Sequence, residues 1–142
     1  MSMKDRRNTV DSVLIGVTDA ATNALTANLD CQDANYATIR VLLSAEANTN
    51  SSNVAIQISE SDDEVATNFA TFNANFNRTV DNTAAAVATS HIDLEGRKRY
   101  LRITVTPDTT TNGAVGISAM GTLYKAVRSA DLSDYGDDVV VG

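Results

Sequence analysis

The stretch YLRITVT, Tyr100–Thr106, decides the fold because its side chains alternate between apolar and polar. Successive side chains of an extended chain point to opposite faces, so Leu101, Ile103 and Val105 share one face. The polar residues of the stretch fall on the other face. This period of two predicts a strand that buries one face and exposes the other.

Outward from this stretch, the same alternation runs through residues 36–45, 53–60 and 115–124, and more weakly through 11–17, 24–29, 84–89 and 91–94. Polar, turn-forming connections such as NTNSSN (48–53) and PDTTTNG (107–113) separate the stretches. The pattern predicts an all-β fold, a single antiparallel β-sandwich or jelly roll. The predicted core consists of Ile39, Val41, Leu43, Val54, Ile56, Ile58, Leu101, Ile103, Val105, Val115 and Ile117.

Residues 65–76 fit two interpretations. Their large apolar side chains follow helical steps of four, three and four, at Val65, Phe69, Phe72 and Phe76. Asp62 or Asp63 is available as an N-cap. The Thr and Asn residues between the aromatic ones are poor helix formers. We favour a strand with an irregular loop whose Phe residues close one edge of the core, and keep a helix as the alternative.

The length of 142 residues fits one domain, and abundant Thr, Asn and Ser suit strands and turns. Both ends differ from the middle. Residues 1–9 are mostly polar and include Arg6 and Arg7, and residues 129–142 carry aspartates before three valines. We expect a flexible N-terminal arm (1–9), a β-sandwich domain (10–128) and an acidic C-terminal arm (129–142). The last is either a frayed tail or a strand that adds to a neighbour.

The sequence offers little for catalysis or for cofactors. His91 is the single histidine and Cys31 the single cysteine, and neither lies in a recognisable nucleophile motif. Zinc sites need more His or Cys ligands, and the glycines do not have the spacing of phosphate-binding loops. We therefore expect no enzyme, no catalytic, cofactor or metal residues, and no internal disulfide.

Membranes and nucleic acids are not expected partners either. No apolar run approaches the roughly 18 residues that cross a bilayer. The run Val13–Val17 is too short for a secretory signal, and Asp11 interrupts its approach. The net charge of −7 opposes binding to a polyanion.

Two charged clusters stand out. The carboxylates of residues 60–64 offer oxygen ligands for calcium, but they lack EF-hand spacing, so a solvated turn is favoured. The basic cluster comprises Arg97, Lys98, Arg99 and Arg102. For these cations a solvated face or a salt-bridged protein contact is favoured over contact with nucleic acid.

Three elements in order, QISESDDE (57–64), DLEGRKRYLRITVT (93–106) and AVGISAMGTLY (114–124), resemble a group of small tailed-bacteriophage proteins. The distinctive parts are ESDD (60–63) and KRYLR (98–102). The resemblance covers mainly residues 36–124, and the chain departs from it in the Asn-, Thr- and Ala-rich region 65–90. Such proteins are commonly found with phage head genes, and the resemblance implies a capsid decoration, or cement, protein with the sandwich or jelly-roll fold.

The resemblance also implies a function. It is a non-enzymatic virion protein on the capsid surface that bridges subunits of the major capsid protein and forms a homotrimer. The alternatives are a carbohydrate-binding sandwich and a tail or fibre component. The residues expected to bind partners are Arg6, Arg7, Arg99, Arg102, Asp134, Tyr135, Val139, Val140 and Val141.

Overall fold

The computed structural model describes residues 7–45, 51–73, 76–108 and 113–126. Over these residues the chain is built from strands and one short 3₁₀ turn, η2 (Ala66–Asn68). The strands are β1 (Arg7–Ala20), β2 (Leu25–Asp30), β3 (Tyr36–Leu43), β4 (Ser52–Ser61), β5 (Ala70–Asn73), β6 (Arg78–Val80), β7 (Ala86–Asp93), β8 (Tyr100–Asp108) and β9 (Val115–Ala126).

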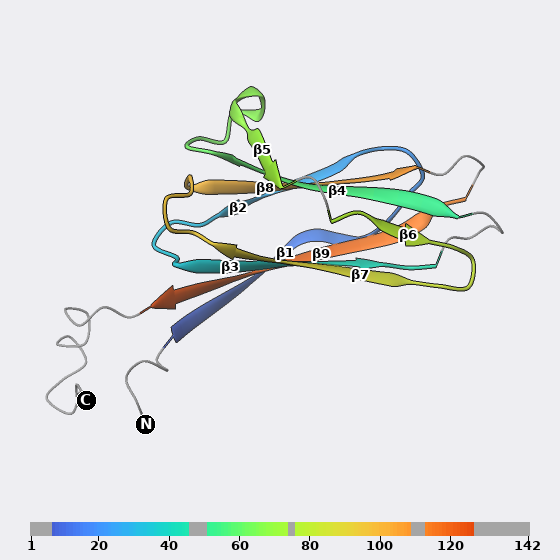
Figure 1. Cartoon of the computed structure of the whole chain (residues 1–142), viewed down its shortest axis with the longest axis horizontal. Helices are drawn as coiled ribbons and strands as arrows, with labels where there is room; N and C mark the ends of the chain where they lie inside the picture. The colour runs from blue at the N-terminus through green and yellow to red at the C-terminus, as the bar shows by residue number, and fades with distance from the viewer. Residues whose placement is uncertain (1–6, 46–50, 74–75, 109–112, 127–142) are drawn as a thin grey trace, which may run out of the picture.

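The strands form two stacked layers (Figure 1). Sheet A has the order β1-β9-β3-β7, and sheet B has the order β2-β8-β4-β5, with β6 also pairing with β4. The pairs in both sheets are antiparallel. Except for β4, β5 and β6, consecutive strands lie in different sheets, so sequence neighbours face each other across the core. The predicted antiparallel β-sandwich or jelly roll is confirmed.

The core lies between the two sheets and is filled by the alternating residues. Every residue of the predicted core is at most 3% exposed. β3 shows why: Ala37, Ile39, Val41 and Leu43 point inward, while Arg40 and Leu42, which alternate with them, are exposed. The apolar face of each strand becomes buried because only the opposite sheet can cover it.

The segment 65–76 forms no α-helix in its described part. It contains η2 and then β5, which pairs with β4. The helical spacing of the aromatic residues was therefore misleading, and the favoured strand-and-loop interpretation is the correct one. Phe72 and Phe76 pack partly buried against the core, as expected for residues that close its edge.

β1 and β9 extend together beyond the other strands of sheet A at one end of the sandwich (Figure 1). β1 begins at Arg7, inside the range predicted for the N-terminal arm, and Arg7 pairs with Ala126 of β9. Residues 1–6 and 127–142, which include the rest of both predicted arms, lie outside the described residues. In the part that the structure describes, no helix is long and apolar enough to span a bilayer.

Candidate interaction surfaces

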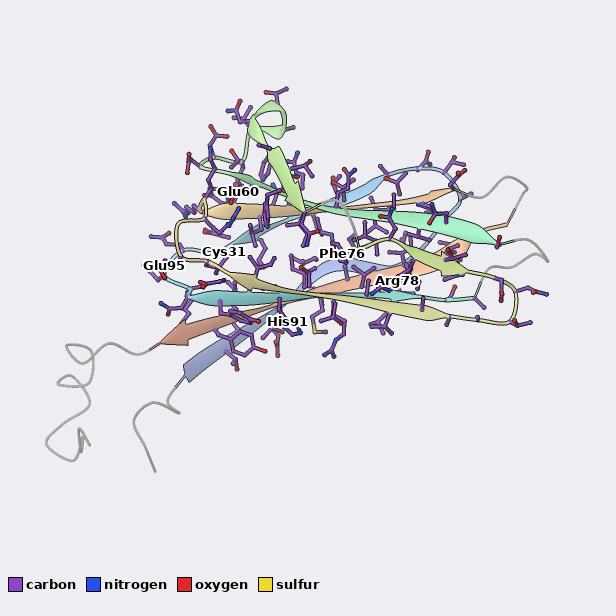
Figure 2. The ribbon with its side chains drawn as sticks, viewed as in Figure 1. Cys31, Glu60, Phe76, Arg78, His91 and Glu95 are labelled. Carbon is purple, nitrogen blue, oxygen red and sulfur yellow. The ribbon has the colours of Figure 1, made fainter. Side chains whose placement is uncertain are left out.

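The basic cluster lies at the β7–β8 turn, where Gly96 adopts a positive φ of 73°. A glycine reaches this conformation without the strain that a Cβ would cause. The turn places these cations next to acidic side chains that are distant in the sequence. Arg97 lies 3.3 Å from Glu60, and Lys98 lies 3.1 Å from Asp62. Both acids belong to the end of β4 or the turn that follows it, and Figure 2 shows Glu60 at this end of the sandwich.

Arg99 forms the best-aligned pair of the cluster. Its Nε and Nη2 donate to the two carboxylate oxygens of Asp30 at 2.9 and 2.8 Å. The hydrogen bonds from Arg99, with a lesser one from the backbone N–H of Gln32, hold the pKa of Asp30 below its ordinary value, against the opposing effect of burial. The pair links the last residue of β2 to the residue just before β8, and so it supports the pairing of these two strands at this end of sheet B.

Arg102 and Arg97 also lie over two aromatic rings of the segment that follows β4. The Arg102 guanidinium lies 3.9 Å from the centroid of the Phe69 ring, and that of Arg97 lies 4.5 Å from the Phe72 ring. Arg102 further donates to Asn28 Oδ1 at 2.9 Å and to the carbonyl of Ala66 at 3.2 Å. These cation–π and hydrogen-bond contacts hold η2 and the side chains of Phe69 and Phe72 against Arg102 of β8 and Arg97 of the preceding turn.

Arg99 and Arg102, both predicted to bind partners, thus have acceptors within their own chain. Neither is deeply buried, since the Arg99 side chain remains 45% exposed and Arg102 is half-buried. Their role toward a partner stays a prediction. Of the other predicted contacts, Arg7 lies in β1, while Arg6, Asp134, Tyr135, Val139, Val140 and Val141 lie outside the described residues.

The acidic turn after β4 is organised by Asp63. Its carboxylate accepts hydrogen bonds from Asn68 Nδ2, the Val65 N–H and the Ser61 hydroxyl. These donors, Asn68 foremost, lower the pKa of the Asp63 carboxyl. Among the residues that the structure describes, no group of three or more His, Cys, Asp or Glu is arranged to hold a metal ion. The Asp63 carboxylate thereby holds the turn together by hydrogen bonds within the chain.

Cys31 and His91 lie in different environments. The Cys31 thiol is buried, and burial raises its pKa to about 12. His91 is exposed on the outer face of sheet A, where its Nδ1 lies 3.2 Å from the Thr38 hydroxyl oxygen. Figure 2 shows Cys31 between the layers and His91 on the outer side of sheet A. The two side chains are thus separated by a sheet and do not form a catalytic pair.

Sequence reasoning missed an apolar patch on the outer face of sheet A. Arg40 of β3 pairs with Met120 of β9, and Met120 pairs with Val13 of β1. One row further along, Leu42 of β3 pairs with Val87 of β7. The four apolar side chains are between 43% and 70% exposed. We call these residues the sheet A patch: Arg40, Val13, Leu42, Val87 and Met120.

Arg40 differs from the other arginines whose side chains the structure describes. Arg78, Arg97, Arg99 and Arg102 each donate hydrogen bonds to groups of their own chain. Arg40, in contrast, is exposed and has no side-chain hydrogen bond or ion pair in the described part of the chain. The sequence contained a signal for this patch, because Leu42 and Met120 occupy positions on the otherwise polar sides of their strands.

An aromatic group lies beside the sheet A patch. Tyr36 stacks against His91 with ring centroids 6.1 Å apart, and it meets Tyr124 edge-on at 5.7 Å. Asp11 accepts a 2.7 Å hydrogen bond from Thr122 in the neighbouring row. The outer face of sheet A therefore combines apolar, aromatic and charged groups from four strands.

The outer face of sheet B is different in kind. The register places Thr26, Thr104 and Gln57 side by side there, and Asn28 next to Arg102. These side chains are polar and suited to water. Only sheet A therefore presents an apolar face to solvent within the described residues.

The sequence matches no protein-family model and no curated protein. Solved structures share its architecture. A chain in the structure of infectious bursal disease virus, Gx strain, superposes with a TM-score of 0.55 and 8% identity over 89% of this chain. This chain spans about a third of that one, at 34%.

A second similar structure is the C-terminal family 22 carbohydrate-binding module of Clostridium thermocellum Xyn10B. It superposes with a TM-score of 0.51 and 12% identity, covering 88% of this chain and 89% of the module. At such low identities these similarities establish the shared β-sandwich fold alone, because one fold hosts unrelated functions.

Proposed function

We propose that this chain is a non-enzymatic structural protein of a virion, which decorates the outer capsid surface and bridges subunits of the major capsid protein. The observation that carries the proposal is the sheet A patch, an exposed apolar face around an arginine that has no partner among the described residues. The phage-protein resemblance of residues 57–64, 93–106 and 114–124 supports the same function, and the fold is one that a viral protein also uses.

The composition of the patch is that of a protein interface. Arginine, methionine and aromatic residues are enriched at the centres of interfaces, where water is excluded. Arg40 and Met120 are adjacent at the middle of the patch, and Tyr36 and Tyr124 lie at its border. Many copies of a modest contact of this kind add up on a symmetric particle, which suits a decoration protein.

The test uses heads of the phage that encodes this chain, prepared from a strain with the gene deleted. The purified protein should co-sediment with these heads and saturate at a fixed ratio to the capsid subunit. It should also raise the temperature at which the heads release DNA. The proposal is wrong if the protein does not bind the heads, or if mass spectrometry finds it in tails instead, as the tail or fibre alternative predicts.

A carbohydrate-binding function is the second candidate, and the Tyr36, His91 and Tyr124 group favours it. Sugars stack on aromatic rings and hydrogen-bond to nearby polar groups, and Thr122 and Asp11 lie in the next row. A glycan array read with the wild type and Tyr36→Ala decides the matter. Binding that depends on Tyr36, together with no binding to heads, would favour this candidate over capsid decoration.

A further inference from the structure

The sheet A patch has features that point to a specific occupant. An exposed apolar face costs solubility unless a partner covers it, and Arg40 at its centre has no counter-ion among the described residues. The occupant should therefore bring apolar side chains together with a carboxylate. It should also be long enough to cross several strands.

The size of the face can be judged from its strands. Four strands about 4.8 Å apart, with eight residues of β3 at about 3.4 Å each, give sheet A an outer face of roughly 500 Å² in projection. A stable interface buries about 800 Å² of accessible surface per partner. Because protruding side chains raise the accessible area above the projected one, the face is close to the size that a stable contact needs.

Residues 129–142, which we call the acidic segment, have the required chemistry. The segment carries Asp131, Asp134, Asp137 and Asp138, interleaved with Leu132 and Tyr135 and followed by Val139–Val141. A carboxylate placed on Arg40 would form a charge-assisted hydrogen bond, and the apolar side chains would cover Val13, Met120, Leu42 and Val87. Its charge and its apolar content both complement the patch.

The direction of β9 determines which copy the acidic segment can reach most directly. The β1–β9 pairing continues to Arg7 and Ala126, two residues past the pair of Tyr124 with Tyr36 where β3 begins. Figure 1 shows β1 and β9 projecting beyond the other strands of sheet A. β9 itself runs from Met120 of the patch toward Ala126, away from the patch. Extended, residues 127–142 span up to about 50 Å, which exceeds the roughly 27 Å length of the face.

We propose that the acidic segment of one copy docks on the sheet A patch of a second copy, with an aspartate on Arg40. Copies that each donate one segment and accept one form a closed ring where the rotation between copies closes, and an open filament where it does not. The inference rests on the proposed function only in treating the patch as a protein-binding surface. Its test contains no capsids, so the two proposals can fail separately.

The experiment uses two variants that each remove one half of the contact. Deleting residues 129–142 leaves an intact patch, and Arg40→Glu leaves an intact segment but reverses the central charge. By analytical ultracentrifugation, the full chain should self-associate, and each change should weaken this at least tenfold. Mixing the two variants should restore a one-to-one complex, because one supplies the patch and the other the segment.

The matched control is Lys98→Glu, which makes the same change in net charge at an exposed ion pair in the β7–β8 turn, outside the sheet A patch. It should leave self-association unchanged.

A full chain that stays monomeric, or a mixture that forms no complex, overturns the proposal. If truncation shifts the NMR signals of β3 and β9 without changing the mass, the segment covers its own patch and docking between copies is wrong. If Arg40→Glu leaves self-association unchanged, the acidic segment does not dock on the sheet A patch and the proposal is wrong.

Discussion

Ile103→Ala is expected to lower the free energy of unfolding by about 4 kcal/mol. Ile103 is 1% exposed and lies in β8, between Ala27 of β2 and Ile58 of β4. The substitution removes three buried carbons at about 0.8 kcal/mol each, or about 2.4 kcal/mol of transfer free energy. Strands on both sides hold the neighbours in place, so the site collapses little and the cavity adds about 1–2 kcal/mol.

Urea unfolding followed by circular dichroism measures this loss. The midpoint should fall while the slope stays constant, because the change alters stability and not the surface exposed on unfolding. The melting temperature should drop by about 10–15 °C. Ile103→Val, which keeps most of the side chain, should cost only about 0.5–1.5 kcal/mol.

Val17→Ala is the control for a general effect of shortening an aliphatic side chain. Val17 is 88% exposed, so its truncation should change the free energy of unfolding by less than about 0.5 kcal/mol. A loss below about 1 kcal/mol for Ile103→Ala, or equal losses at both positions, would refute the burial of Ile103 at the centre of the sandwich.

Three further outcomes follow from the packing and the charges. Gly121→Val should destabilise the fold by about 1–3 kcal/mol in urea unfolding, because a Cβ at Gly121 would lie 2.9 Å from Leu29 Cδ2; an unchanged midpoint would contradict this close packing. Arg99→Gln should destabilise the protein at pH 7 but not well below pH 3.8. The lowered pKa of Asp30 contributes stability that is present above the unfolded value and is lost as pH falls through the folded one, so an equal difference between wild type and variant at both pH values would argue against the pair. Cys31 should react with a thiol reagent only after unfolding, because burial raises its pKa to about 12, and rapid labelling of the native protein would be inconsistent with that.

The candidate surfaces were predictable only in part. The basic cluster was expected to be a solvated face or a salt-bridged contact, and it forms ion pairs, but with acids of its own chain. Its partners could not be identified beforehand, because Arg99 and Asp30 are 69 positions apart in the sequence. The helical spacing of Phe69 and Phe72 kept a helix open as the alternative, whereas in the structure their rings lie against the guanidinium groups of Arg102 and Arg97.

β1 illustrates another reason for incomplete prediction. Its alternation was weak in the sequence, and the structure shows two register shifts against β9, between Val13 and Ile15 and between Ile15 and Thr18. Each shift changes which residues face inward, so a strict period of two cannot describe the strand. Ile15 is buried as a result, while Val13 and Val17 are exposed.

The sequence by itself determined that the stretches of β3, β4, β8 and β9 are strands, and which side of each of them is buried. That information is local, because successive side chains of an extended chain alternate between faces whatever the neighbouring strand. Residues such as Ile39, Ile56 and Ile103 could therefore be assigned to the core one strand at a time.

Only the tertiary structure decided which strands are neighbours, and with that the properties of the surface. Val13, Met120 and Arg40 form one row because β1, β9 and β3 pair in that order, although these strands are far apart in the sequence. Each exposed apolar residue is unremarkable alone, and it becomes part of an interaction surface only when pairing places several of them together. Strand pairing depends on contacts distant along the chain, which no local pattern encodes.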